Sequence, residues 1–519
     1  MLALGALAVL GAWALGWPPG GSVAVPLGLA AMVGVASPPA SVAAVALALP
    51  FAGRLMPLAG ARFGPLELAI GVSGLAVGSR ALLDIGRGRG RALWGSLARP
   101  IATTVPALAL LAVATWSLAV VAEPAYRRVS LREYRLVVVE PLLLFASGRL
   151  VLRRAPARRL LVGGLMLAGF GAAGVGIVQV FTGAGLIEAD GVSRARGTFS
   201  HPNNLAFLLE RIGLLAVGIA SAIWPRRASL PALAAAAVVF AGLGATFSRG
   251  ALLGVAAGFS VVAATRGRKS VWGRLAIGAT AALVVLTVAA GDRLVAAGGD
   301  GRIPTRLLIW RAAVEMGLDR PLTGVGLDQF LTQYGRRYVS PAGWSERFTS
   351  HPHNLALDLW LRLGILGPAV GVWLGVAVAR GARRLDAIAL GAAAALVGGV
   401  AHGLVDQAFF LPELAVMTWL LVALIETVVR PGSAIDGNDG ANFGFRGGHG
   451  DVARGLGRVV AVARGRRPRR HTGGASASDR TVAVRIAGSR RRRGVRARAR
   501  VPVGGDRDGR TERSLPGHG

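Results

Sequence analysis

The chain lacks cysteine and is poor in charged residues. With no cysteine among its 519 residues, it can form neither disulfide bonds nor thiolate metal sites. Charged residues make up only 16% of the chain. A soluble globular protein needs a larger charged surface, so this low fraction argues against a water-soluble fold.

Acidic residues are the scarcer charged class, at 26 against 59 Lys and Arg, which leaves a formal charge of +33. Such an excess would suit nucleic acid, but its distribution argues otherwise. Residues 431–519 carry 20 Arg against 7 acidic residues, and most of the remaining excess lies in short connections between apolar runs. This is the pattern of membrane topology, and we expect no nucleic-acid partner.

Apolar residues are abundant, at 53% of the chain, and the mean hydropathy is +0.54. Apolar stretches able to cross roughly 30 Å of hydrocarbon recur through residues 1–430, and each must be helical to satisfy its backbone. We predict an all-α polytopic membrane protein with about 12–14 transmembrane helices. Residues 1–17 lack the basic start of a cleavable signal peptide and are interpreted as the first span. The clearest spans are residues 100–121, 136–152, 160–182, 204–224, 229–247, 250–265, 275–291, 355–379, 385–405 and 411–429.

Short basic connections predict the orientation, because Arg and Lys are retained on the cytoplasmic side. Segments 183–203 and about 292–353 then face outward. One connection disagrees, since it would place four Arg residues outside. The five inward loops contain Arg87, Arg89, Arg91 and Arg99; Arg153, Arg154, Arg158 and Arg159; Arg226 and Arg227; Arg266, Arg268, Lys269 and Arg274; and Arg380, Arg383 and Arg384. The disagreeing connection contains Arg127, Arg128, Arg132 and Arg135.

The outward loop of about 60 residues is the main soluble portion of the predicted transmembrane domain, and loops of that length are usually functional. Its periodicity over residues 306–317 predicts an amphipathic helix at the surface, ended by Arg320-Pro321 and by Gly324 and Gly326. Residues 431–519 form a second region, a disordered, Arg- and Gly-rich cytoplasmic tail. The tail could contact anionic membrane lipids or could be a solvated tail with no specific partner.

The first polar cluster runs from Arg196 to Asn204, in the sequence Arg-Gly-Thr-Phe-Ser-His-Pro-Asn-Asn. Pro202 can start a helix and the asparagines, Asn203 among them, can cap it. Backbone N–H groups and Arg196 would then be left to meet an anion. The alternative is a capped helix start beside a solvated arginine.

The second cluster, in the long loop, contains Arg302, Arg306 and Trp310 and is followed by Pro-Leu-Thr-Gly-Val-Gly at 321–326. Guanidinium groups match phosphate oxygens bidentately, so arginines from separate loops could hold a pyrophosphate. Arg306 and Trp310 lie four residues apart on one helical face. Alternatively, Trp310 anchors the helix at the headgroups while Arg306 reaches to water.

The third cluster is His351-Pro-His353-Asn354. Histidine titrates near neutral pH, so His353 is a candidate general base that accepts a proton from a sugar hydroxyl. A helix-capping histidine is the alternative. His-x-His spacing could also indicate a metal pair, but no third ligand stands at a familiar spacing, and we predict no metal site.

Further polar residues lie within or beside the predicted spans. Arg249, in Ser-Arg-Gly at 248–250, could join the anion site or reach to water. Glu210 and Arg211 should point apart, because neighbours on a helix lie about 100° from each other. His402 and Asp406, at positions i and i+4, are expected to form a structural hydrogen-bonded pair.

With these motifs in this order, the chain resembles the O-antigen ligase and polymerase family of bacterial membrane glycan transferases. The resemblance covers about residues 190–430. It rests on Arg-Gly-Thr-Phe and Pro-Asn at 196–203, Ser-Arg-Gly at 248–250, Arg306 with Trp310, Pro-Leu-x-Gly-Val-Gly at 321–326, and His353-Asn354 before Leu-Gly-Ile-Leu-Gly at 363–367.

The resemblance implies an enzyme of the plasma (inner) membrane that needs neither a cofactor nor a metal. Its donor would be a glycan on undecaprenyl pyrophosphate and its acceptor a glycan, lipid or protein. Arg196 and Arg306 would stabilise the departing pyrophosphate and His353 would activate the acceptor, with Asn203, Arg249, Arg302, Trp310 and Asn354 binding substrate. Many members have an acidic residue before the last Leu-Gly, where this chain has Arg362. An acid-assisted histidine therefore has no support from the resemblance.

Two other interpretations remain. A repeat-unit polymerase of the same family would share all these features with a ligase. A secondary transporter or flippase would instead show two related halves and charges at mid-membrane, whereas here no repeat is evident and the polar clusters lie at one face.

Overall fold

The computed structural model describes residues 37–58, 61–90, 102–119, 124–189, 191–267, 269–297, 305–382 and 385–428, all within one compact unit, Met1–Arg446. The first predicted span and the basic tail lie outside these residues. The helices are α3 (Pro38–Ala48), α4 (Pro65–Asp84), α6 (Thr104–Ala119), α7 (Arg127–Glu133), α8 (Glu140–Val151), α9 (Ala155–Thr182), α10 (Pro202–Ile223), α11 (Leu230–Gly244), α12 (Arg249–Arg266), α13 (Val271–Ala297), α14 (Thr305–Asp319), α15 (Phe330–Gln333), α16 (Leu355–Leu363), α17 (Leu366–Gly381), α18 (Ala387–Gly403) and α19 (Pro412–Glu426).

The strands of the described residues form two antiparallel hairpins. One pairs β1 (Met56–Leu58) with β2 (Ala61–Phe63), and the other pairs β3 (Ile187–Ala189) with β4 (Val192–Arg194). The second hairpin lies between α9 and α10, in the first segment predicted to face outward. The prediction of an all-α fold is confirmed, because these short hairpins only connect helices.

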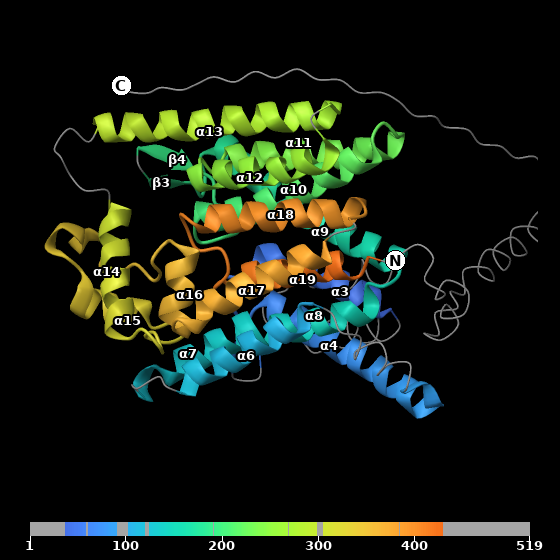
Figure 1. Ribbon diagram of the computed structural model, residues 1–519, viewed down its shortest axis with the longest axis horizontal. Helices are drawn as coiled ribbons and strands as arrows, with labels where there is room; N and C mark the ends of the chain where they lie inside the picture. The colour runs from blue at the N-terminus through green and yellow to red at the C-terminus, as the bar shows by residue number, and fades with distance from the viewer. Residues whose placement is uncertain are drawn as a thin grey trace, which may run out of the picture. The chain divides into compact units, whose positions relative to one another are not determined.

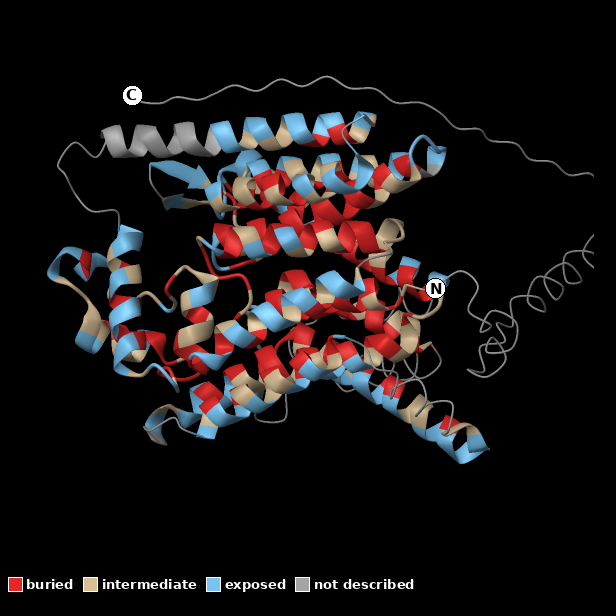
Figure 2. Cartoon of the chain, in the orientation of Figure 1, coloured by how far each residue is buried: buried red, intermediate tan, exposed pale blue. Residues whose placement is uncertain are grey.

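Most helices lie side by side in one bundle, while α14 stands across one end of it (Figure 1). Helix α10 is at the centre, in contact with α9, α11, α12 and α18, and its residues are almost all buried (Figure 2). On the other side, α19 contacts α8, α17 and α18, and α16 joins α14 to α17. The core is therefore built around α10, α18 and α19.

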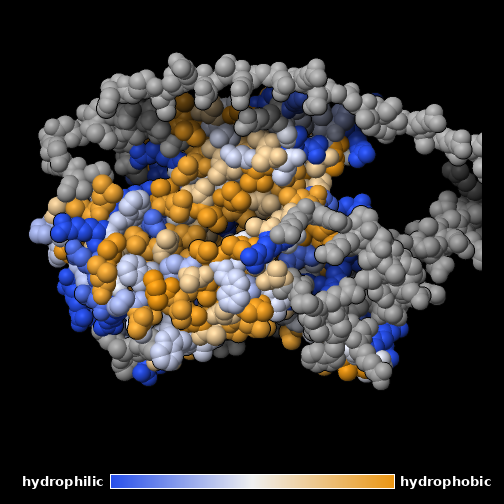
Figure 3. All heavy atoms as spheres, in the orientation of Figure 1, coloured by the Kyte–Doolittle hydropathy of each residue, from blue (hydrophilic) through white to orange (hydrophobic). Residues whose placement is uncertain are grey.

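The face of the bundle seen in Figure 3 is largely apolar. In Figure 3, hydrophobic residues cover its middle, and hydrophilic residues gather at the end that carries α14. Within the described residues, three helices are long and apolar enough to cross a membrane, namely Pro65–Arg89, Ala155–Thr182 and Pro202–Ile223. Six shorter apolar helices accompany them: Pro38–Phe51, Thr104–Ala119, Leu230–Gly244, Val271–Val285, Leu366–Gly381 and Ala387–Gly403. These helices form the fold of an all-α membrane protein.

The predicted single span over residues 355–379 is wrong. The helix ends at Leu363, Gly364 adopts a left-handed conformation with φ of 69°, and a new helix starts at Leu366. A Cβ at Gly364 would overlap the carbonyl of Leu322, so the chain of the long loop passes directly against this break. The break separates α16, which supports the polar end, from α17, which lies along the bundle.

The two glycine-rich motifs bind each other at this break. The N–H groups of Val325 and Gly326 donate to the carbonyl of Leu361 at 2.7 and 3.1 Å, and the N–H of Ile365 donates to the carbonyl of Pro321 at 3.0 Å. These bonds satisfy backbone groups left over where α16 ends. Pro-Leu-Thr-Gly-Val-Gly therefore positions α14 relative to α16.

Candidate active site

Asp406 lies at the centre of a polar cluster at the α14 end of the bundle. It follows α18 and is buried, with 4% of its surface exposed. Side chains from the loop before α10, from α14 and from the loop before α16 reach it. Three segments that are far apart in the sequence therefore meet at one carboxylate.

Two imidazoles approach one oxygen of this carboxylate. His353 Nδ1 lies 2.9 Å from Asp406 Oδ1, and His351 Nε2 lies 3.6 Å from the same atom. The backbone N–H of Gln407 also donates to Oδ1, at 2.8 Å. The His351 and His353 ring centroids are 4.3 Å apart. A carboxylate at Nδ1 orients the His353 ring and directs its Nε2 away from Asp406.

The other oxygen of Asp406 faces α10. Asn203 donates from Nδ2 to Asp406 Oδ2 at 2.5 Å, and Arg194 Nη2 donates to Asn203 Oδ1 at 2.6 Å. Arg194 Nε also donates to the carbonyl of Thr246 at 2.7 Å. A continuous chain of hydrogen bonds thus joins β4 to the buried carboxylate.

Helix α14 presents Arg306 and Trp310 to the same cluster. Arg306 Nη1 donates to the Val405 carbonyl at 2.7 Å, and its Nη2 lies 3.8 Å from Asp406 Oδ2. Trp310 Nε1 donates a hydrogen bond to the His353 carbonyl at 3.4 Å. The prediction that one helical face carries both residues is confirmed, and this face contacts the site.

Local backbone geometry fixes the two polar loops. His201 caps α10, because its Nδ1 accepts from the N–H of Asn203 at 3.2 Å. Asn354 caps α16 by accepting from Ala356 and Leu357, and it donates to the Leu404 carbonyl at 2.9 Å. His353, the residue before Asn354, has a φ of 52°, a strained conformation for a residue with a side chain.

The electrostatics of the cluster favour a charged carboxylate among neutral imidazoles. Burial alone would raise the pKa of Asp406, but the hydrogen bonds from His351 and His353 lower it well below its ordinary value. Burial lowers the pKa of His351 and that of His201. Asp406 therefore stays ionised at neutral pH while these two imidazoles stay neutral.

The structure brings together five of the predicted site residues: Asn203, Arg306, Trp310, His353 and Asn354. Arg196 lies in the same loop as Asn203, but its Nε donates to the Gly185 carbonyl at 3.2 Å.

The remaining predicted site residues are Arg249 and Arg302. Arg249 is exposed at the start of α12. Arg302 lies outside the described residues.

The sequence analysis missed Arg194 and Asp406. It assigned Asp406 to a pair with His402, which is wrong, because α18 ends at Gly403 and the i, i+4 geometry of a helix does not extend to Asp406. His402 Nδ1 instead lies 2.7 Å from Glu210 Oε2. The carboxylate that contacts His353 is Asp406, which follows α18.

His402 and Glu210 form a second polar pair, which is buried in the bundle. Both residues have no exposed surface, and the His402 ring stacks on Phe207 with centroids 3.6 Å apart. A Cβ on Gly250 would overlap His402, and a Cβ on Gly254 would overlap Glu210. The glycine of Ser-Arg-Gly therefore lets α12 approach this pair.

Arg211 confirms the expectation that it and Glu210 point apart. It donates to the carbonyls of Ala408 at 2.7 Å and Leu414 at 3.1 Å. It thereby holds the chain that connects Asp406 to α19.

From His-x-His spacing alone, the sequence analysis found no third metal ligand. The structure supplies one in Asp406, which lies 53 residues after His353 in the chain. Each of His351, His353 and Asp406 offers one ligand atom, and these atoms all lie within 4.8 Å of one another. Among the described residues, this is the set that can hold a metal ion.

Residues 232–372 match the model of the family described as O-antigen ligase. Over this segment, which is less than a third of the chain, the protein is similar to the O-antigen ligase family. No curated protein matches the chain. The O-antigen ligase segment contains Arg306, Trp310 and His353, whereas Arg194 precedes it and Asp406 follows it. The match supports a membrane protein that acts on glycans, and the polar cluster is its candidate active site.

Proposed function

We propose that this protein transfers a glycan from undecaprenyl pyrophosphate to an acceptor hydroxyl at the outer face of the plasma membrane. The observation that carries the proposal is the His353 imidazole, held by the buried carboxylate of Asp406 beside Arg306. A positioned base next to a fixed cation suits a reaction that removes a proton and releases an anion. In this proposal the long loop, about 292–353, faces the exterior.

His353 acts as the general base. When its Nδ1–H donates to Asp406, Nε2 carries a lone pair and can accept the proton of the acceptor hydroxyl. The ionised Asp406 also stabilises the imidazolium that forms, as a carboxylate does in other base–acid pairs. The side chain of His353 is 22% exposed, so Nε2 is within reach of a substrate.

The transfer is a single displacement. The acceptor oxygen loses its proton to His353 Nε2 and bonds to the anomeric carbon. The bond from that carbon to the pyrophosphate oxygen breaks, and lipid pyrophosphate leaves with the electron pair. Proton and charge balance without a metal or a nucleotide sugar.

Arginines stabilise the leaving group. Arg306 uses Nη1 for the Val405 carbonyl and has five N–H donors in all, so donors remain for phosphate oxygens. We assign Arg196 as its partner from the opposite loop, with Arg249 and Arg302 available to the same anion. Asn203, Trp310 and Asn354 use their polar atoms inside the protein, and we assign them positioning roles.

The test is deletion of the gene in its host, followed by complementation. Loss of the protein should deplete surface polysaccharide and accumulate lipid-linked glycan. Wild-type protein should restore both, while His353→Ala and Arg306→Ala, present at equal membrane levels, should restore neither. Full rescue by both variants would count against the proposal.

The accumulated intermediate also distinguishes the two family activities. Single repeat units on the carrier would indicate a polymerase, and finished chains on the carrier would indicate a ligase. Unflipped intermediates on the cytoplasmic face would support a flippase instead.

A further inference from the structure

The Asp406 cluster contains two imidazoles, one more than an acid–base pair requires. His351 and His353 both direct a ring nitrogen at Asp406 Oδ1, at 3.6 and 2.9 Å. For the proposed transfer, His353 alone provides the base. The second imidazole therefore calls for another explanation.

Two imidazole nitrogens and one carboxylate oxygen form a ligand set that zinc favours. Zinc–nitrogen bonds are about 2.0–2.1 Å, and three protein ligands leave a fourth position for water. The three ligand atoms lie within 4.8 Å of one another, so small side-chain movements would bring them around one ion. A hard cation such as magnesium prefers oxygen ligands and fits this set poorly.

The cluster is open to an ion from solvent. The side chains of His351 and His353 are 19% and 22% exposed, while that of Asp406 is 6% exposed.

Positive charges near Asp406 limit the affinity of the cluster for zinc. Arg306 Nη2 lies 3.8 Å from Asp406 Oδ2, and Arg194 is one side chain further away, through Asn203. A divalent ion must also displace the proton on His353 Nδ1. These costs make binding reversible, so that the metal competes with the proton.

We infer that this cluster is an inhibitory zinc site, in which His351 Nε2, His353 Nδ1 and Asp406 Oδ1 bind the ion. Zinc on Nδ1 takes the lone pair of that nitrogen and removes the hydrogen bond to Asp406. The proton of the neutral ring then lies on Nε2, which has no lone pair left to accept the acceptor proton. Binding depends only on the ligand set, whereas the inhibition rests on the proposed function.

The test uses full-length protein, purified without a polyhistidine tag and stripped with EDTA. Zinc binding is measured by calorimetry, and cobalt is added as a probe whose visible absorption reports low-coordinate nitrogen and oxygen ligands. The variants are His351→Ala, which loses one ligand, and Glu346→Gln, which removes a carboxylate from the same loop and serves as the matched control. Transfer is measured with zinc and with magnesium, relative to each variant's own rate in EDTA.

We expect zinc, and not magnesium, to inhibit wild type and Glu346→Gln, with recovery in EDTA. In His351→Ala the zinc concentration for half-inhibition should rise at least about tenfold, and the cobalt band should disappear. Equal zinc binding by wild type and His351→Ala would overturn the site. Transfer that zinc leaves unchanged would overturn the inhibition.

The same experiment separates the two proposals. If EDTA-treated protein transfers glycan but binds no zinc, the zinc site is wrong and the proposed function stands. If zinc binds through His351 but EDTA-treated wild type shows no transfer from a lipid-linked donor, the site stands and the proposed function is wrong.

Discussion

At the scale of single residues, Asp406 determines the geometry of the cluster. Its two oxygens accept from His353, Gln407 and Asn203, and Arg306 lies beside them. A buried charge persists only when such partners compensate for its lost hydration. The same contacts that keep Asp406 ionised therefore set the orientation of the base.

Asp406→Asn should reduce transfer by about 10²–10⁴-fold, the usual contribution of a positioned acid–base group. Asparagine is nearly isosteric, but its amide favours the tautomer that lacks a lone pair on Nε2 of His353. Initial rates with purified protein measure the loss. Asp386→Asn is the matched control, because Asp386 caps α18 at its other end and should leave the rate unchanged. An unchanged rate in Asp406→Asn would show that His353 does not depend on this carboxylate.

Acidification should destabilise the folded protein below about pH 6.5. The lowered pKa values of His201 and His351 mean that the unfolded chain binds protons at a higher pH than the folded chain does. Stability contributed by neutral imidazoles is thus complete above pH 6.5 and declines as pH falls. The lowered pKa of Asp406 acts in the same direction in stronger acid.

Thermal unfolding in detergent at pH 7.5 and 5.5 measures this dependence. His201→Gln should reduce the difference between the two temperatures, because glutamine does not titrate. A variant that retains the full difference would exclude His201 as a contributor.

At the scale of elements, most helices could be predicted from apolar runs alone. The predicted spans over 160–182, 204–224 and 385–405 coincide with α9, α10 and α18 except at their ends. The break between α16 and α17 could not be predicted this way. It depends on Gly364 lying against Leu322, a contact between segments that only the folded chain brings together.

The candidate site, too, could be predicted only in part from the sequence. Polar clusters in an apolar chain pointed to His353, Arg306 and Asn203, because polar residues beside membrane spans need a reason to be there. Asp406 was missed because a helical spacing rule was applied beyond the end of α18. Arg194 was missed because its bonds to Asn203 and to the Thr246 carbonyl form only in the folded chain.

Gly254→Ala should destabilise the bundle by about 1–3 kcal/mol, the usual cost of overpacking. The added methyl group would overlap the Glu210 carboxylate and force α12 away from α10. Unfolding temperatures in detergent measure the change. The matched control is Gly278→Ala on α13, where a Cβ meets nothing within 4 Å and alanine favours the helix. Equal unfolding temperatures for the two variants would contradict the tight packing at Gly254.

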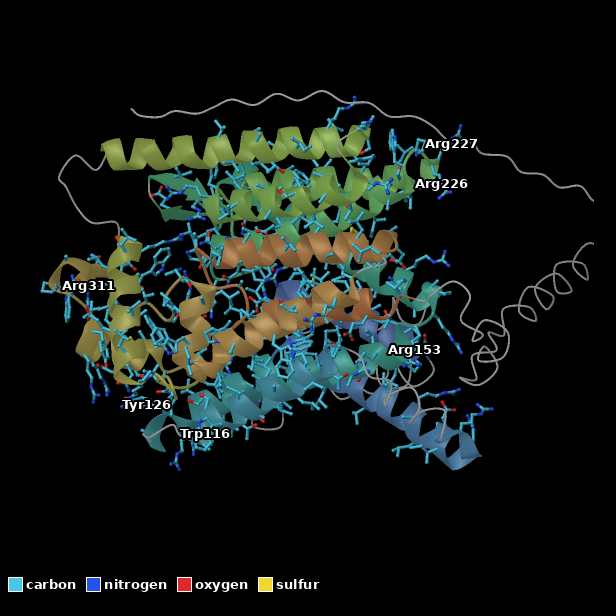
Figure 4. The ribbon with its side chains drawn as sticks, in the orientation of Figure 1. Trp116, Tyr126, Arg153, Arg226, Arg227 and Arg311 are labelled. Carbon is cyan, nitrogen blue, oxygen red and sulfur yellow. The ribbon has the colours of Figure 1, made fainter. Side chains whose placement is uncertain are left out.

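At the scale of the whole molecule, two of the basic loops lie at the end of the bundle opposite α14. In Figure 4, Arg153, Arg226 and Arg227 lie at one end, and Arg311 of α14 lies at the other. This separation supports the predicted orientation, in which the basic loops are cytoplasmic. The disagreeing connection is partly neutralised, since Arg135 pairs with Glu67 at 3.0 Å and Glu140 at 2.7 Å.

The absence of cysteine makes this orientation easy to measure. Single Arg227→Cys and Arg311→Cys variants can be labelled in intact cells with a thiol reagent that does not cross the membrane. We expect Arg311→Cys to react in intact cells and Arg227→Cys to react only after permeabilisation. The reverse result would put the candidate site on the cytoplasmic side, away from a flipped donor.

Transfer by purified protein is the most direct test of the central claim. The measurement is the initial rate from a defined glycan on undecaprenyl pyrophosphate to an acceptor, in EDTA, for wild type and His353→Ala at matched folding. We predict transfer by wild type and a loss of at least about 100-fold in His353→Ala, because in the proposed transfer the acceptor proton goes to His353. An equal rate in the two proteins would contradict the assignment of His353 as the base.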